Sequence, residues 1–218
     1  MKRFISILML LCFSTSMLQA SASTVSKEAN THILDIRNIE ANEQCQVSDA
    51  MTYDEMRARC AEISGIPYIP TEECRTESIL RREPGYREVT IRLDVTDEYK
   101  PSLVLYFETE QNGQYWAIKS LYSVQLNREY RFLNADGELV SIVKQFSGDI
   151  EIWVRSLYEV EYVINGDFYN YGTTTNSGGA GLEVNIGEAA KISFSASTTT
   201  SNNHYKYFYR HRTIAVQN

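Results

Sequence analysis

Apolar and polar residues alternate with a period of two through most of the chain after Tyr86. In the first such segment the apolar positions are Val89, Ile91, Leu93 and Val95, with polar or charged residues between them. Successive side chains of a β-strand point to opposite sides of a sheet, so this pattern predicts strands with one buried face. The alternation recurs at Leu103, Leu105 and Phe107, at Ile150, Ile152 and Val154, and at Tyr158, Val160, Tyr162 and Ile164.

Turn signals separate these apolar rows. Asn112-Gly113, Asp136-Gly137 and Asn165-Gly166 each join a residue that tolerates positive φ to a glycine. Such pairs are the strongest short-range sign of a β-hairpin. Ser147-Gly148-Asp149 is a further candidate for a tight connection. Short strands with close turns are typical of antiparallel meanders, so we expect a mainly β protein with an antiparallel β-sandwich over residues 86–218.

One segment ahead of the strands has a helical pattern. Its apolar residues recur at helical spacing, namely Tyr53, Met56, Cys60 and Ile63. Ser48 or Asp49 is a suitable N-cap, and Ser64-Gly65 a suitable end, so we expect a helix over about residues 48–63. Residues 23–85 are then a short N-terminal segment with one helix and a cysteine-containing loop, tied by a disulfide and packed on the sandwich.

The first 22 residues have the pattern of a secretory signal peptide. Lys2 and Arg3 precede an apolar run from Phe4 to Phe13, which is too short to span a bilayer. Ala20-Ser21-Ala22 is a small-residue cleavage pattern, and the mature chain then begins at Ser23, or at Ser21 if Ala20 is used. The sequence predicts an exported protein, periplasmic or secreted. The lack of an Asn-x-Ser/Thr sequon favours a bacterial export route.

Cys45, Cys60 and Cys74 remain after such cleavage. In an oxidising compartment two of them should pair, and the sequence leaves all three pairings open. The chain has 28 acidic against 21 basic residues, and removal of Lys2 and Arg3 makes the mature protein more acidic still. An acidic chain is a poor partner for polyanions, so we expect no nucleic-acid partner.

Histidines in the sequence are few and widely spaced. The three histidines are His32, His204 and His211, and the last two are seven residues apart, a spacing that puts them on opposite faces of a regular strand. We therefore expect no metal site and no cofactor.

Glu159 and Glu161 share a strand face, and Glu151 and Trp153 suit a neighbouring strand. A row of this kind is typical of a solvated outer face. A hydrolase that uses Glu151, Glu159 or Glu161 is kept as an alternative, because paired carboxylates beside an aromatic ring can perform acid–base chemistry.

Surface aromatic residues carry the main functional hypothesis. They are Trp153, Tyr169, Tyr171, Tyr205, Tyr207 and Tyr209, of which the last three share one face of a terminal strand. Aromatic rings supply a large contact area at low entropic cost. The sequence therefore predicts a non-enzymatic binding protein that recognises a glycan or a protein partner. A periplasmic inhibitor or immunity protein with an acidic face is a variant of this hypothesis.

Residues 182–199 suggest another alternative. Leu182, Val184 and Ile186 share one face before Gly187, and Ile192 and Phe194 share one face after it, opposite serine and lysine residues. Membrane barrels use this alternation, with apolar residues toward lipid. The segment is interpreted as an amphipathic hairpin, either an ordinary half-buried one or the membrane-active element of a secreted β-pore-forming protein.

Overall fold

The computed structural model describes residues 45–65, 67–69, 85–176 and 180–216. They belong to one compact unit that runs from Ile39 to Asn218. A second unit, Met1–Asn38, lies wholly outside the described residues. The predicted signal peptide and Cys74 also lie outside them.

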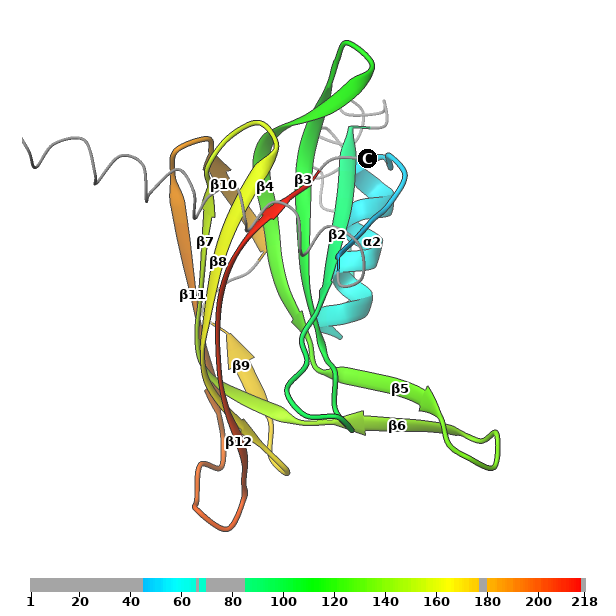
Figure 1. Ribbon diagram of the computed structural model, residues 1–218, viewed down its shortest axis with the longest axis vertical. Coiled ribbons are helices and arrows are strands. Elements are labelled where there is room, and N and C mark those ends of the chain that lie inside the picture. The colour runs from blue at the N-terminus through cyan, green and yellow to red at the C-terminus, as the bar shows by residue number, and fades with distance from the viewer. Residues whose placement is uncertain (1–44, 66, 70–84, 177–179, 217–218) are drawn as a thin grey trace, which may run out of the picture. The chain divides into compact units, whose positions relative to one another are not determined.

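Two five-stranded antiparallel sheets make up most of the described chain (Figure 1). The first sheet has the order β1 (Cys45–Val47), β2 (Tyr86–Arg92), β3 (Ser102–Asn112), β4 (Tyr115–Asn127) and β10 (Ala180–Asn185). The second has the order β12 (His204–Ala215), β8 (Glu159–Tyr169), β7 (Gln145–Val154), β11 (Ala189–Ala196) and β9 (Thr174–Asn176). A separate two-stranded ribbon contains β5 (Glu129–Leu133) and β6 (Leu139–Val143). The prediction of a mainly β, antiparallel fold is confirmed.

Side chains from both sheets meet in one hydrophobic core. The first sheet contributes residues such as Ile91, Leu105 and Phe107, and the second contributes residues such as Ile152, Tyr162 and Phe168. Each of these side chains is at most 2% exposed. Full burial of one large apolar side chain stabilises a fold by about 1.5–3 kcal/mol, so the alternating rows supply the main driving force. The arrangement is compatible with a β-sandwich, and the predicted inward rows of β2, β3, β7 and β8 are its interior.

The helix α2 (Tyr53–Ser64) is capped by Thr52 rather than by Ser48 or Asp49, so the predicted start was wrong. Thr52 Oγ1 accepts a hydrogen bond from Glu55 N, and Thr52 N donates one to Glu55 Oε2, which completes a capping box. Ser48 cannot serve as the cap because it continues the pairing of β1, with Ser48 N donating to Glu88 O at 2.9 Å. Gly65 ends the helix at φ 68°, as predicted.

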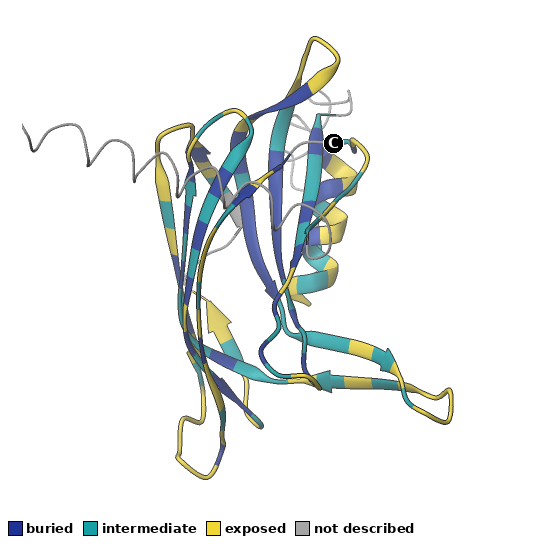
Figure 2. Cartoon of the chain, in the orientation of Figure 1, coloured by how far each residue is buried: buried dark blue, intermediate teal, exposed yellow. Residues whose placement is uncertain are grey.

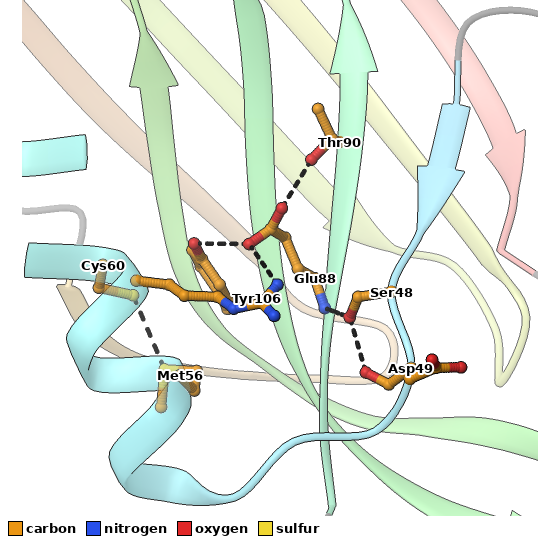
Figure 3. A network of polar contacts seen from close by, with 8 residues as sticks. Ser48, Asp49, Met56, Cys60, Glu88, Thr90 and Tyr106 are labelled. Atoms are coloured by element: carbon orange, nitrogen blue, oxygen red, sulfur yellow. Dashed lines mark hydrogen bonds and ion pairs between the residues drawn. The ribbon is translucent and has the colours of Figure 1, made fainter. Parts of the chain in front are cut away.

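Helix α2 covers the outer face of the first sheet. Its buried residues Tyr53, Met56 and Cys60 form a second cluster with Tyr86, Val104 and Tyr106 of the sheet. Figure 3 shows a polar network at this contact, in which Glu88 accepts hydrogen bonds from Tyr106 Oη and Thr90 Oγ1, both at 2.9 Å. Arg59 of α2 lies 3.5 Å from the same carboxylate. Burial, and then the charge of Glu88, raises the pKa of Tyr106, so this phenol remains a neutral donor.

The glycines near the middle of the second sheet were wrongly predicted as turns. Asp136-Gly137 lies between paired strands, and Gly113 does too, with Asn112 as the last residue of β3. Asn165-Gly166, however, lies inside β8 and Ser147-Gly148-Asp149 inside β7. Gly148 and Gly166 sit opposite each other in the pairing of these strands. The connection between β7 and β8 is instead the turn at 155–158, where Arg155 N donates to Glu159 O.

Residues 182–199 do not form a hairpin of paired strands. Strand β10 pairs with β4 in the first sheet, whereas β11 pairs with β7 and β9 in the second. Val184, Ile192 and Phe194 are buried in the core between the sheets, Leu182 packs against it, and Ile186 is exposed. Alternation predicts which face of a strand is buried, but it does not specify the neighbouring strand, and the prediction failed for that reason. No helix among the described residues has the length and apolar character to cross a membrane.

Cys45 and Cys60 are both free thiols. Cys45 packs against the core between the sheets, and Cys60 lies between α2 and the outer face of the first sheet. A disulfide between these two cysteines is excluded because the backbone of the first sheet separates them. The disulfide-tied segment predicted from the sequence is thus not seen in the described residues.

Candidate functional site

The outer face of the second sheet is left open by the described elements. Helix α2 covers the corresponding face of the first sheet, and no described helix or strand lies over the second (Figures 1 and 2). We call this surface the open face. Its outward residues include Tyr207, Tyr209 and His211 on β12, Glu161, Val163, Asn165 and Asp167 on β8, Asp149, Glu151 and Trp153 on β7, and Lys191 and Ser193 on β11.

Two exposed tyrosines stand at one side of the open face, on its edge strand β12. Tyr207 is 53% and Tyr209 56% exposed. They are two residues apart, which places their Cα atoms about 6.7 Å apart along an extended strand. Tyr207 lies opposite Asp167 and Tyr209 opposite Asn165, and Tyr207 Oη donates to Asn165 Oδ1 at 2.9 Å. Each ring is therefore flanked by a carboxylate or an amide on the next strand.

A chain of polar and ring contacts links His211 to Trp153 across the open face. His211 Nε2 lies 2.7 Å from Glu161 Oε1, and Arg155 Nε lies 2.5 Å from Glu161 Oε2. The Arg155 guanidinium stands over the Trp153 ring, 5.4 Å from its centroid. The hydrogen bond from Arg155, assisted by His211, holds the pKa of Glu161 below its usual range. Glu161 is therefore a stable anion in this network.

A second group of carboxylates on the open face surrounds Lys191. Lys191 Nζ lies 3.0 Å from Asp149 Oδ2 and 3.3 Å from Glu151 Oε1. Ser193 Oγ donates to Asp149 Oδ1 at 2.6 Å. Hydrogen bonds from Ser193 and Lys191 lower the pKa of Asp149. A general acid needs a raised pKa, so neither Asp149 nor Glu161 suits that role.

The structure brings together part of the predicted ligand-binding set. Trp153, Tyr207 and Tyr209 lie on the open face, and Tyr171 is 74% exposed in the turn that follows β8. Glu151 and Glu161 lie on the same face as Trp153, as the strand pattern indicated. Glu159 precedes Glu161 by two residues on β8 and shares that face, with the inward residue Val160 between them.

Tyr205 and Tyr169 do not belong to this exposed group. A bulge between His204 and Lys206 shifts the alternation of β12, so Tyr205 packs against the core with Tyr99, at 5.9 Å between ring centroids. Lys144 Nζ stands over the Tyr205 ring at 4.2 Å. Tyr169 is buried and its ring contacts His204. A bulge leaves no clear mark in the sequence. The alternation of residues along β12 therefore predicted the wrong face for Tyr205.

The same bulge changes the position of the histidines. His204 and His211 each meet a carboxylate of the open face, with His204 Nε2 2.8 Å from Asp167 Oδ1. They therefore do not lie on opposite faces as a regular strand predicts. Within the described parts of the chain, no three His, Cys, Asp or Glu side chains gather as a metal-binding group.

A cavity of about 740 Å³ lies elsewhere, between the C-terminal part of α2 and the strands β4, β9 and β11. Arg57, Cys60, Gln125 and Phe194 are among its lining residues. Of the residues predicted to bind a ligand, none lines it. The open face thus remains the surface where the predicted aromatic and acidic residues meet.

His211, Asn165, Asp149 and Lys191 were not predicted as parts of a site. Their roles depend on which strands are neighbours, since Asn165 lies between Tyr209 and Asp149, and Lys191 lies opposite Glu151. Alternation in the sequence identifies them as outward residues of strands. The missing information is the order of strands in the sheet.

Comparison with protein-family models gave no match for this chain. Comparisons with curated proteins and with solved structures gave none either.

Proposed function

We propose that this protein is a non-enzymatic glycan-binding protein that acts after export and uses the open face as its binding surface. The observation that carries the proposal is the pair of exposed rings, Tyr207 and Tyr209, beside the amide and carboxylates of β8 and β7. Tyrosine has an apolar ring and a polar hydroxyl, so it contacts both the C–H faces and the hydroxyls of a sugar. The neighbouring carboxylates and Asn165 are acceptors for sugar hydroxyl groups.

The composition of the open face favours a glycan over a protein partner. Protein interfaces carry a buried apolar centre in which charged residues are depleted. The centre of the open face instead places Val163 among Asp149, Glu151 and Glu161, with the cationic partners Lys191 and Arg155. These side chains are held in place by one another, so they can bind hydroxyl groups without a large loss of side-chain entropy.

The lowered pKa values of Asp149 and Glu161 support a role in binding. A carboxylate that stays ionised accepts hydrogen bonds from sugar hydroxyl groups at all ordinary pH values.

A glycan array followed by calorimetry on the mature protein tests the proposal. Tyr207→Ala and Tyr209→Ala should each weaken binding at least about tenfold, the loss expected when one stacked ring is removed. Tyr115→Ala is the matched control, because Tyr115 is a comparably exposed tyrosine at the β3–β4 hairpin, away from the open face. Binding that is equally weakened by all three changes, or unaffected by any, would overturn the proposal. Capture of a protein but no glycan would point to the other predicted partner class.

Export and a disulfide are further parts of the proposal. Residues 1–22 support export by their charge and hydropathy pattern, and Cys74 is the partner left for Cys45 or Cys60. Mass spectrometry of the exported protein, with peptide mapping without reduction, should find a start at Ser21 or Ser23 and one Cys74-containing disulfide. A retained N-terminus, or three reduced thiols after export, would contradict these points.

A further inference from the structure

The ribbon formed by β5 and β6 is a two-stranded sheet of its own. It follows β4 and precedes β7, so it joins the two larger sheets along the chain, and it extends away from both (Figure 1). No third strand among the described residues pairs with it. Tyr130 and Ile142, at the end of the ribbon nearest the sheets, pack against the core. A two-stranded ribbon is only marginally stable in water without such support, and Leu133 and Leu139 at its far end are exposed.

The ribbon also exposes large apolar side chains. Leu133 is 68% and Leu139 67% exposed, and the two are paired at its far end. Val143, at the other end of β6, is exposed as well. Isolated exposed leucines are normal on a protein surface, but here they gather on one ribbon that has unpaired edges.

The two edges of the ribbon differ in charge. Strand β5 carries Glu129 and Arg131, which form an ion pair at 2.7 Å. The hydrogen bond and the charge of Glu129 raise the pKa of Arg131, so this guanidinium remains a cation on β5. Strand β6 reads Leu-Val-Ser-Ile-Val and has no charge, proline or glycine. Proteins usually protect exposed strand edges with such residues, and β6 has none of them.

We infer that β6 pairs with β6 of a second copy of this chain in an antiparallel arrangement centred on Ser141. In that register Ser141 lies opposite Ser141 of the second copy, Val140 lies opposite Ile142, and Leu139 lies opposite Val143. Every pair is apolar or neutral, and no charge is placed against an apolar side chain.

The resulting sheet has four strands and a continuous apolar face. Tyr130, Phe132, Val140 and Ile142 share one side of the ribbon, and pairing of two copies doubles this row. Tyr130 and Phe132 already stack at 5.4 Å between ring centroids. A second copy of this chain carries the same uncharged β6, which is complementary to itself in the antiparallel register. A different partner would need an exposed, uncharged strand edge of its own. The inference is independent of the ligand bound by the open face.

Sedimentation analysis over a wide concentration range tests the pairing. The wild-type protein should form a dimer, and Leu139→Lys should raise the dissociation constant at least about tenfold, because it places a charge against Val143 of the other copy. Leu139→Lys combined with Val143→Glu should restore the dimer, since each introduced lysine then faces an introduced glutamate. Leu133→Lys is the matched control, an equally exposed leucine on β5, and should leave the dimer intact.

A cross-link provides a second readout of the register. Under oxidising conditions, Ser141→Cys should give a larger fraction of covalent dimer than the wild type gives. Arg131 is paired with Ser141 on β5, and Arg131→Cys should give no such increase. A protein that is monomeric at all concentrations, or a dimer weakened equally by Leu133→Lys and Leu139→Lys, would overturn the inference. Far-UV circular dichroism of each variant shows that loss of the dimer is not loss of the fold.

Discussion

Gly148 of β7 and Gly166 of β8 face each other across the strand pairing with no room for a side chain on either. A Cβ on Gly148 would lie 2.3 Å from Asn165 O, and one on Gly166 would lie 2.4 Å from Ser147 O and 2.7 Å from the Phe146 ring. The two glycines therefore let β7 and β8 approach closely and let the buried Phe146 ring pack over the gap. These residues shape the sheet that carries the open face.

Gly148→Ala should destabilise the protein by about 2–3 kcal/mol, because the added methyl group overlaps backbone atoms that cannot move aside easily. Urea denaturation followed by fluorescence measures the change. Gly187→Ala is the control, since Gly187 also has a positive φ, of 87°, but a Cβ there meets no atom within 4 Å. That variant should lose only about 1 kcal/mol. Equal losses in both variants would show that φ alone, and not the close approach, requires Gly148.

Thr52→Ala should lower the free energy of unfolding by about 1 kcal/mol. It removes the Oγ1 acceptor of Glu55 N at the start of α2 and leaves that end of the helix without its side-chain cap. Thr52→Ser keeps a hydroxyl at the same position and should retain most of the stability. A loss as large in the serine variant would mean that the methyl group, and not the cap, stabilises the helix. Thermal denaturation by circular dichroism distinguishes the two.

Acid should weaken the fold partly through Glu161. Its pKa is lowered in the folded protein, by Arg155 first and then by His211, so it contributes stability above its unfolded pKa near 4.5. That contribution is lost as the pH falls through the lower folded value. Glu161→Gln should flatten the stability profile below about pH 4.5 and cost at most about 1 kcal/mol at neutral pH, because Arg155 is half exposed.

Glu98→Gln removes one exposed negative charge that takes no part in the contacts of Glu161 and serves as the control. Its acid profile should follow that of the wild type. Arg155→Gln removes the largest cause of the lowered pKa and should reproduce the profile of Glu161→Gln. A steep acid loss that persists in both of these variants would show that other carboxylates control acid unfolding.

The inward rows could be predicted from the sequence because burial follows from alternation alone. Val89, Ile91 and Leu93 are buried as predicted, and so are Ile150, Ile152 and Val154. The helix could be predicted for the same reason, since Met56 and Cys60 share its buried side. These properties depend only on residues close together in the chain.

Strand order and bulges could not be predicted in this way. The segments on either side of Gly187 are neighbours in the chain but pair with β4 and β7, in different sheets. Tyr205 faces inward because β12 has one irregular step. The open face follows the same rule: its outward residues are visible as a pattern, but the contact of Glu161 with His211 requires β8 to lie beside β12.

Cys60 should be an unreactive thiol in the folded, reduced protein. Burial against Met56 and the first sheet raises the pKa of Cys60 to about 11, with a smaller opposing effect of a hydrogen bond from Ser123. At pH 8 only about one such thiol in a thousand is ionised, and the thiolate is the form that attacks an alkylating reagent. Labelling with iodoacetamide, followed by peptide mapping, should therefore modify Cys60 only as fast as the protein opens.

Ser195→Cys, on an exposed position of β11, supplies a reference thiol that should react rapidly. Labelling of Cys60 at the rate of that reference would mean that α2 does not stay packed on the first sheet in solution.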